Sequence, residues 1–556
     1  RGGHAVNPIV RRELLGLLRT PTAVSVVIGC AVITAVLIVV HWPAGGVADI
    51  GGTAALGMLR GLGYGLLSGL LLVLPAFPAT AIVRERVAGT LALLLNSPLP
   101  PWSIYVGKLG GILGFTAILL LMTLPGAAAG YALGGSTVTG GVGLLYVVLF
   151  VAAIQIATVG LLVSSRAQGI DGALRTTYGI VLAISVLPLT IHWLLPRDSA
   201  ASTAIASWVG SLSPVPGLME AIGHGGVGML GVDYGSGAVA RYAIVGLALS
   251  TLLALITIWG LGRAPLDRPR PAGVMTQDRS TKGQILRRLL FLVDPSRRSG
   301  GTTLLVNPVF VKELRTRRFG RAHWLLRIVA LTAILSLGLS VIAAIEAIGW
   351  GLEKIGAAMV LLQEALLILF VPSLSAGLIS AEREAGAWQL LRTTPLSAGA
   401  ILRGKLLSAA GPVVLLLCAT LPGYVVMAMI KPETSHQIWR VLTCMGVMAV
   451  FAVMVGAAAS SLFRSTAVAT AASYGFLAII CIVPLLVWLG REGPFGHTAV
   501  TTALTIDPVA AALNAANTPG FAQYDLLPTN WWVMGGMSLA LLLVLIVRTR
   551  RLYRPD

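Results

Sequence analysis

Runs of predominantly apolar residues, each long enough to cross a lipid bilayer, recur along the whole length of this chain. A membrane-spanning helix needs about 20 such residues. The chain is therefore predicted to be an all-α polytopic membrane protein with 12 transmembrane helices. The predicted spans are residues 22–40, 57–81, 112–133, 142–163, 177–195, 242–261, 325–345, 357–379, 406–430, 438–462, 473–489 and 531–547.

The composition agrees with a membrane protein and excludes an ordinary soluble one. Of the 556 residues, 56% are hydrophobic and only 11% are charged, whereas a soluble domain carries about a quarter charged residues. The 65 glycines suit the close approach of helices in lipid. The four cysteines lie singly in apolar runs without metal-ligand spacing, which favours a packing role. They are Cys30, Cys418, Cys444 and Cys481.

The distribution of positive charge predicts the orientation in the membrane. The net charge of +19 is concentrated in alternate loops, a pattern that sets topology and argues against nucleic-acid binding. With the N-terminus in the cytoplasm, 33 of the 40 Lys and Arg residues fall on the cytoplasmic side and seven on the other side. Both termini are therefore predicted to be cytoplasmic. The seven are Arg60, Arg197, Arg241, Lys354, Lys431, Arg440 and Arg491.

The two halves of the chain repeat each other in sequence. Residues 82–109 match residues 379–406 without a gap, and 13 of these 28 positions are identical. We predict two parallel six-helix repeats with pseudo-two-fold symmetry, in residues 1–262 and 306–556, joined by a basic cytoplasmic linker at 263–305. Other matched motifs are Asn7-Pro8 and Asn307-Pro308, Glu13 and Glu313, Gly107-Lys108 and Gly404-Lys405, Pro75 and Pro372, and Pro125 and Pro422.

The matched prolines of spans two and three leave two interpretations open. Proline removes a backbone donor and kinks a helix. Neighbouring helices can satisfy the carbonyl groups that such a kink frees. The kinked helices are either hinges that line a cavity or fixed kinks that serve packing.

The loop between spans two and three carries the most specific of the repeated motifs. Residues 84–95 begin polar and become apolar, which predicts a short helix at the cytoplasmic surface. Its early glutamate suits the helix dipole, and its glycine, which weakens a helix, suggests the close approach of another surface. We predict a docking role, with an ordinary connector as the alternative. The docking residues are Glu85, Arg86 and Gly89, and in the second half Glu382, Arg383 and Gly386.

With these motifs the chain resembles the permeases of type-2 ATP-binding-cassette (ABC) transporters, with two permease units fused. Members of that family have six spans per unit, a connecting helix before span one, a coupling helix with a Glu-x-x-x-Gly signature, and short re-entrant helices after span five. The matching places here are Glu85 to Gly89 and Glu382 to Gly386 for the signature, Asn7-Pro8 and Asn307-Pro308 for the connecting helices, and residues 203–222 and 497–514 for the re-entrant helices.

The resemblance implies an exporter of the bacterial inner membrane that moves an amphipathic, drug-like or lipid-like substrate out of the cytoplasm or inner leaflet by alternating access, as in multidrug efflux. It also implies cytoplasmic ABC ATPase partners, two copies per chain, with membrane lipids around the spans. The chain itself has no GxxxxGK[ST] sequence. ATP and Mg are therefore expected in the partner, and the chain is predicted to be a non-catalytic permease without a cofactor or metal of its own.

Two polar residues fall inside predicted spans. A carboxylate in hydrocarbon is costly, so Glu364 is either a contact for substrate or proton or a polar anchor of its span. Gln155 poses the same choice.

Charged pairs follow span five in both halves, at Arg197-Asp198 and at Arg491-Glu492. They either form an extracellular gate or pair locally at the lipid headgroups.

An ion-coupled secondary transporter of six-plus-six architecture is the main alternative function. Such a transporter needs acidic or basic relays inside the membrane, and Glu364 is nearly alone in that role. A membrane enzyme such as a lipid-modifying transferase would need a polar cluster at an interface, which the sequence does not suggest. The seven histidines show no HExxH motif and no paired ligand spacing.

Overall fold

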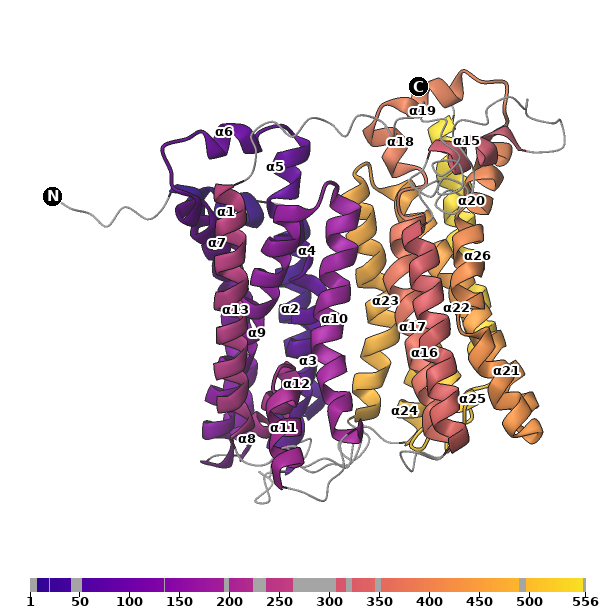
Figure 1. Ribbon diagram of the computed structural model, residues 1–556. Helices are drawn as coiled ribbons and strands as arrows, with labels where there is room; N and C mark the ends of the chain where they lie inside the picture. The colour runs from indigo at the N-terminus through magenta and orange to yellow at the C-terminus, as the bar shows by residue number, and fades with distance from the viewer. Residues whose placement is uncertain are drawn as a thin grey trace. The chain divides into compact units, whose positions relative to one another are not determined.

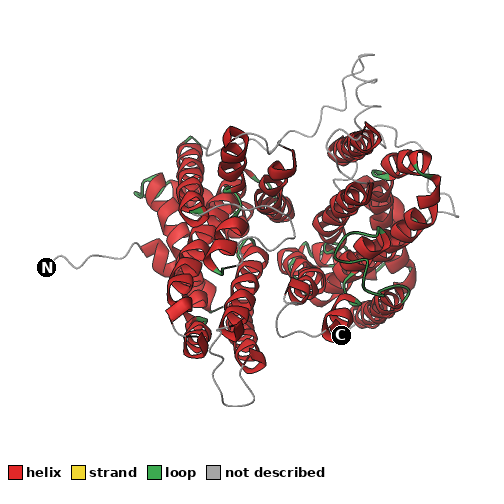
Figure 2. Ribbon diagram, turned by 90° about the horizontal axis from the view of Figure 1, so that it is seen from below, coloured by secondary structure: helices red, strands yellow, loops and turns green. Residues whose placement is uncertain are grey.

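The computed structural model describes residues 8–19, 21–41, 53–134, 136–194, 200–223, 237–263, 307–316, 323–345, 352–489 and 497–553. Every regular element within these ranges is a helix, and none is a strand (Figure 1, Figure 2). The all-α prediction is confirmed for this part of the chain. The chain divides into unit 1, Arg1–Leu266 with Leu485–Val500, and unit 2, Asp267–Pro484 with Thr501–Asp556.

Ten helices of the described chain are long and apolar enough to cross a membrane, which supports a multi-pass membrane protein. They cover ten of the twelve predicted spans. The other two, 22–40 and 325–345, lie in helices that are not among the ten, the second with a shorter apolar stretch at Val329–Val341. The ten are Gly57–Val87, Pro101–Ala129, Gly141–Arg166, Gly172–Leu189, Ala238–Gly262, Ile355–Glu384, Ala398–Ile430, Pro432–Leu462, Thr466–Leu485 and Thr529–Tyr553.

Unit 1 is a bundle of long helices with short helices at both ends. The short helices α5 and α6 lie at one end of the bundle, and α11 and α12 lie at the other (Figure 1). The helices are α1 (Pro8–Leu18), α2 (Pro21–His41), α3 (Thr53–Val73), α4 (Ala76–Ala81), α5 (Val83–Val87), α6 (Leu91–Leu95), α7 (Pro101–Met122), α8 (Leu124–Gly134), α9 (Ser136–Arg166), α10 (Ile170–Leu194), α11 (Ala200–Gly210), α12 (Pro214–Ala221) and α13 (Ala238–Gly262).

Unit 2 is also a bundle of long helices, with α18 and α19 at one end and α24 and α25 at the other (Figure 1). The unit boundaries cut through α23 and α24, so that unit 2 holds most of the first and half of the second. The helices are α15 (Pro308–Thr316), α16 (His323–Ile345), α17 (Leu352–Ser375), α18 (Ser380–Glu384), α19 (Ala387–Arg392), α20 (Ala398–Cys418), α21 (Leu421–Ile430), α22 (Ser435–Leu462), α23 (Thr466–Leu489), α24 (His497–Leu504), α25 (Pro508–Ala515) and α26 (Thr529–Tyr553).

The matched prolines act differently in spans two and three. Pro75 interrupts span two of unit 1 between α3 and α4, whereas Pro372 lies inside the continuous helix α17. Pro125 and Pro422 each stand at the start of a new helix, α8 and α21. The third predicted span of each half lies in a candidate membrane span, Pro101–Ala129 or Ala398–Ile430, and the helix of each is interrupted by a turn before its proline.

Glycines allow spans two and four to cross at close range in each unit. A Cβ atom on Gly160 of α9 would lie 2.6 Å from Pro78 Cγ, and one on Gly456 of α22 would lie 2.8 Å from Ser375 Cβ. Any larger side chain at either glycine would have to push the helices apart. Small residues have this role in membrane helix pairs generally.

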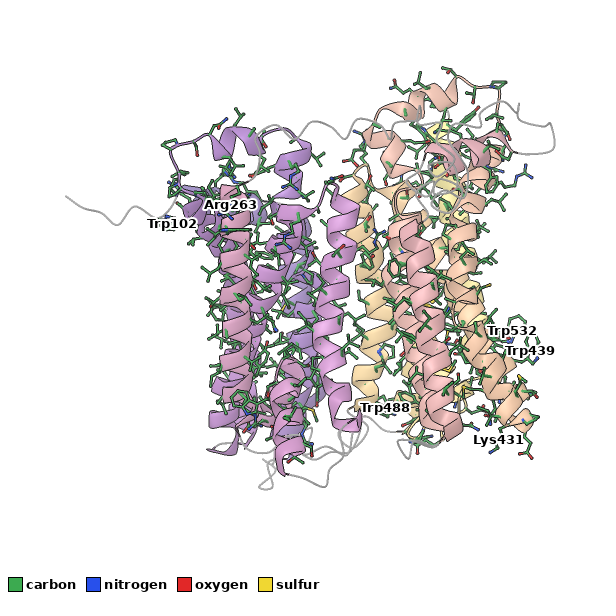
Figure 3. All side chains as sticks on the ribbon, viewed as in Figure 1. Trp102, Arg263, Lys431, Trp439, Trp488 and Trp532 are labelled. Atoms are coloured by element: carbon green, nitrogen blue, oxygen red, sulfur yellow. The ribbon has the colours of Figure 1, made fainter. Side chains whose placement is uncertain are left out.

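Aromatic and basic side chains mark the borders of the apolar zone. In unit 1, Trp102 and Arg263 lie near the end that carries α5 and α6 (Figure 3). In unit 2, Trp439, Trp532 and Lys431 lie toward the end that carries α24 and α25 (Figure 3). Such residues prefer the level of the lipid headgroups, because one part of the side chain is apolar and the other is wet. Of the predicted linker 263–305, only Arg263 is among the described residues.

Candidate functional site

The repeated sequence motifs come together at one end of each unit. We call residues 82–100 of unit 1 and residues 379–397 of unit 2 the signature loops, because they contain the Glu-x-x-x-Gly signature. The first loop is bonded to α1 and to α7, and the second to α15 and to α20. Three segments that are distant in sequence therefore meet in each unit (Figure 1).

Each of the helices α1 and α15 lies directly against the start of span three. A Cβ atom on Gly111 of α7 would lie 2.6 Å from the Cβ of Glu13. In unit 2, a Cβ atom on Gly404 of α20 would lie 2.7 Å from Asn307 Oδ1 and 2.8 Å from Val309 Cβ. Glycine is therefore required at both positions for the helices to approach.

A buried lysine holds the three segments of unit 1 together. Lys108 Nζ on α7 lies 3.2 Å from Glu13 Oε1 on α1 and 2.9 Å from Glu85 Oε1 in the signature loop. The same ammonium donates to the backbone oxygen of Ala81 at 3.0 Å. Arg12 completes the cluster, since its Nη2 lies 2.7 Å from Glu13 Oε1 and 2.9 Å from Glu85 Oε1.

Unit 2 contains the corresponding four charges. Lys405 Nζ on α20 lies 2.9 Å from Glu313 Oε1 on α15 and 2.8 Å from Glu382 Oε2 in the signature loop. Lys312 pairs with Glu382 and lies 3.8 Å from Glu313 Oε1. The residues that match in the two half-sequences thus make matching ion pairs.

The two clusters are electrically balanced and shielded from water at their centres. Each holds two cations and two carboxylates, and both Lys108 and Lys405 are only 1% exposed. Burial alone would raise the pKa of Glu13, but the Lys108 ammonium and the Arg12 guanidinium hold it below its ordinary value. Glu13 is therefore ionised at neutral pH, and the buried lysine depends on it as a counter-ion.

The signature loop of unit 1 is also bonded to the end of span four. Ser164 Oγ on α9 accepts the backbone N–H groups of Ile82 and Val83, both at 3.0 Å. Arg86 donates to backbone oxygens that follow Ser164, including that of Ser165 at 2.5 Å. The last carbonyl groups of a helix have no partner within the helix, so Arg86 caps α9.

The same bonds recur in unit 2. Ser460 Oγ on α22 accepts the backbone N–H groups of Ile379 at 2.7 Å and Ser380 at 2.9 Å. Arg383 Nη1 donates to the backbone oxygen of Ser461 at 3.2 Å. Both signature loops are therefore anchored to three helices each.

The signature glycines serve the backbone turn of the loop. Gly89 and Gly386 have φ angles of 75° and 71°, a left-handed conformation that favours glycine. A Cβ atom on either would meet no atom of the described chain within 4 Å. The prediction of one short helix over 84–95 is wrong, because the glycine turn separates α5 from α6. The glycine is explained by this turn, and the docking role of the six signature residues stays a prediction.

Apolar side chains project from the signature loops. Leu93 is 73% exposed and Val87 is 61% exposed in unit 1, and Leu390, which matches Leu93, is 72% exposed in unit 2. In unit 1 a groove of about 470 Å³ runs between α1 and the loop, bordered by Ile9, Arg12, Thr90 and Leu93 among others. Exposed apolar groups beside a groove are typical of a protein-binding surface.

The second signature loop makes hydrogen bonds to other helices through two residues that differ between the units. Glu384, which stands where unit 1 has Val87, accepts hydrogen bonds from the backbone N–H and hydroxyl of Thr466, at 2.9 and 2.7 Å. Trp388, which stands where unit 1 has Leu91, is buried and donates to the backbone oxygen of Leu552 at 3.1 Å. The second loop is thus bonded to α23 and α26 as well.

The polar residues inside the spans have different environments. Gln155 is fully bonded, since its amide donates to the Leu212 oxygen at 3.1 Å and its oxygen accepts from the Tyr242 hydroxyl at 2.9 Å. This pattern favours the structural interpretation of Gln155. Glu364 is 1% exposed, and neither of its carboxyl oxygens has a hydrogen-bond partner among the described residues.

Sequence reasoning missed the partners of the signature glutamates. Lys108 and Lys405 were visible as repeated charged residues next to a glycine, just before the predicted third spans, and a buried charge needs a counter-ion. If this requirement had been applied to every repeated Lys and Glu, it could have paired Lys108 with Glu13 and Glu85, and Lys405 with Glu313 and Glu382. The predicted gate residues Arg197, Asp198, Arg491 and Glu492 lie outside the described residues.

Comparison with known proteins adds no relative. No protein-family model matches this chain, and no curated protein matches it significantly. The functional interpretation therefore rests on the residues and their geometry.

Proposed function

We propose that this chain is the transmembrane subunit of an ATP-driven ABC exporter in a bacterial inner membrane. In this proposal it has twelve spans in two parallel six-helix units with pseudo-two-fold symmetry, and both termini are cytoplasmic. Two cytoplasmic ATPase subunits bind ATP and Mg and dock on the signature loops. An amphipathic, drug-like or lipid-like substrate then leaves the cytoplasm or inner leaflet by alternating access.

The observation that carries this proposal is the buried lysine cluster in each unit. Lys108 joins the signature loop to α1 and α7, and Lys405 does the same for α15 and α20. Breaking a buried ion pair by removing one partner costs about 3–5 kcal/mol, so the joined segments are expected to move as one body. A force applied to an exposed loop would in this way reach the beginning of a membrane span.

The surface chemistry of the loops supports a protein partner. Leu93 and Leu390 are large, exposed and at matched places. In unit 1 the adjoining groove offers apolar contacts together with the Arg12 guanidinium. A partner helix with an apolar edge fits these surfaces.

An ion-coupled secondary transporter is the second candidate. One observation favours it, namely the unpartnered and buried carboxyl group of Glu364 in α17. A transporter of this kind would move its substrate without ATP.

A co-purification experiment separates the two candidates. The chain is co-expressed with the ATP-binding-cassette ATPase encoded nearest to it, as wild type and as the double variant Leu93→Glu, Leu390→Glu. We expect the ATPase to co-purify with the wild type and the double variant to retain at least tenfold less, because charges would be buried at an apolar contact. Gln389→Glu, one residue from Leu390 and already polar, is the matched control and should retain the ATPase.

Two outcomes would contradict the proposal. One is equal retention of the ATPase by the wild type and the double variant. The other is transport of substrate by the purified chain alone in liposomes, driven by an ion gradient without nucleotide.

A further inference from the structure

Unit 2 buries two carboxyl groups that retain unpartnered oxygens. Glu364 lies midway along α17 and is 1% exposed, and within the described part of the chain both of its carboxyl oxygens lack a hydrogen-bond partner. Asp507 is completely buried at the start of α25. Its Oδ1 accepts the backbone N–H of Val509 at 2.8 Å and the backbone N–H of Ala510 also interacts with the carboxyl group, while its Oδ2 meets the criteria of a hydrogen bond with no described residue.

The two carboxyl groups share one environment. Helix α17 packs against α25, and the Asp507 charge acts electrostatically on Glu364. The Tyr424 hydroxyl on α21 is also buried without a hydrogen-bond partner among the described residues, and the Glu364 charge acts on it electrostatically. The Glu364 charge also acts on the thiol of Cys444 on α22, and both carboxyl charges act on the thiol of Cys481 on α23.

Cations that could neutralise the pair are missing from the described chain around it. Neither carboxyl group forms an ion pair with a lysine or arginine of the described chain, and Arg440 acts electrostatically on the neighbouring Cys444 thiol. The described residues also contain no group of three or more His, Cys, Asp or Glu side chains that could hold a metal ion. Two unpaired carboxylates in a dry interior repel each other and lose their hydration, so both cannot stay ionised.

In unit 1 the two positions that correspond to Glu364 and Asp507 are occupied by uncharged residues. Leu67 stands where unit 2 has Glu364, and Ser213 stands where unit 2 has Asp507. Ser213 caps α12 as Asp507 caps α25, but its hydroxyl is satisfied because it accepts from Val215 at 3.2 Å and donates to the Ser185 oxygen at 2.7 Å. The acidic pair of unit 2 is thus not needed to build the helix cap.

We propose that Glu364 and Asp507 form a proton-binding site inside unit 2, which holds a proton at neutral pH and so keeps α25 packed against α17. A proton from hydronium binds a carboxylate oxygen, which gives a neutral carboxylic acid and releases water. Loss of the proton leaves two like charges in the packed interior, which favours separation of α25 from α17. The site exists whether or not an ATPase binds the signature loops.

Carbodiimide labelling tests this site directly. Dicyclohexylcarbodiimide reacts with protonated carboxyl groups in apolar surroundings, and mass spectrometry of the purified full chain locates the adduct. We expect an adduct on Glu364 or Asp507 at neutral pH, which decreases about tenfold per pH unit once the apparent pKa of the pair is passed. Glu220 is the control, because its two oxygens accept backbone N–H groups at 2.6 Å from Gly237 and Val239, and it should not be labelled.

A variant that copies unit 1 keeps the test decisive if single changes fail to fold. Glu364→Leu with Asp507→Ser should fold, lose the adduct, and lose the infrared carbonyl band of a protonated carboxylic acid that the wild type shows. Glu220→Gln should keep both signals. The proposal is overturned if the folded wild type shows neither the adduct nor the band at any pH. It is also overturned if sodium or another metal cation at fixed pH abolishes the adduct, since the pair would then bind that cation.

Discussion

The two units are alike where their signature loops are anchored and unlike inside their spans. At the loops, Lys108 and Lys405 bridge two glutamates each. Inside the spans, unit 2 has Glu364 where unit 1 has Leu67. The comparison suggests that one requirement, a firm attachment of the loop, applies to both units. The interior of each unit serves a purpose of its own.

The clusters themselves differ in depth, and this difference decides how much each lysine should matter. The glutamates that bind Lys405 are 4% and 12% exposed, whereas those that bind Lys108 are 24% and 18% exposed. Water screens an exposed ion pair and weakens it. The cluster of unit 2 is therefore expected to be the stronger of the two.

The largest predicted effect comes from removing the buried lysine of unit 2. Lys405→Met should lower the free energy of unfolding by about 3–5 kcal/mol, because two buried carboxylates lose their counter-ion. Lys108→Met should cost clearly less. Thermal unfolding of the full chain in detergent measures both. Adding Glu313→Gln and Glu382→Gln to Lys405→Met should restore most of the loss, and equal losses at the two lysines would contradict the difference in depth.

A smaller loss of stability is expected from removing the additional hydrogen bond that holds the second signature loop to α26. Trp388→Leu introduces the residue of unit 1, removes the hydrogen bond to Leu552 and leaves a cavity, for a loss of about 2 kcal/mol. The same unfolding assay measures it. The exposed neighbour Leu390, changed to Ala, should alter stability by less than about 0.5 kcal/mol. A loss for Leu390→Ala as large as that for Trp388→Leu would show that the buried indole gives no special support.

The signature glycines should respond equally in the two units. Gly89→Ala and Gly386→Ala should each cost about 1–2 kcal/mol in the free chain, because alanine is strained at these positive φ angles. The corresponding changes to Asn should cost less. Gly16→Ala, in the interior of α1 with open space around it, should be neutral or stabilising. If Gly89→Ala and Gly386→Ala left the stability of the free chain unchanged and weakened only the binding of a partner, this explanation would be wrong. The glycines would then be needed because the partner approaches them closely.

The smallest predicted effects are opposite pH dependences at the two ends of the units. The folded pKa of Glu13 is below its ordinary value of 4.5, so its contribution to stability is present above that pH and is lost as the pH falls through the folded value. Burial raises the pKa of Asp507 well above its ordinary value of 3.8, so stability falls as the pH rises from there through the folded value. The measurement is the free energy of unfolding as a function of pH. Glu13→Gln should reduce the loss of stability at acidic pH, and Asp507→Ser should reduce the loss of stability as the pH rises. A variant that reduced the loss at the opposite end of the pH range would contradict these assignments.

Much of the fold could be predicted because the bilayer imposes a simple pattern. Apolar runs gave the existence of ten long helices in the described chain, and the repeated Glu85 and Arg86 motif marked the loop that the helices anchor. The matched prolines Pro125 and Pro422 marked where the helix of the third span is irregular, but an apolar run looks the same whether its helix is kinked or interrupted at that point.

The site was only half predictable because ion pairs depend on approach in space. Glu85 was selected for its place in a motif, but its contact with Lys108 depends on how the signature loop folds back onto α7, and the contact of Glu13 with Lys108 depends on how α1 lies against Gly111 of α7. Asp507 was overlooked because an aspartate before a proline is an ordinary helix cap. Asp507 becomes a candidate proton-binding residue only because its charge acts on Glu364, which is far away in the sequence.

The central claim is that each signature loop moves together with its anchoring helices. Its most direct test is a distance measurement by electron paramagnetic resonance between spin labels at Gly16→Cys on α1 and Arg84→Cys on α5, two exposed positions, with the native cysteines replaced. The chain is studied in lipid nanodiscs together with the proposed ATPase partner, with and without ATP. We predict the same narrow distance distribution in both states and a broad one in Lys108→Met. A change of several ångströms between the nucleotide states of the wild type would contradict the claim.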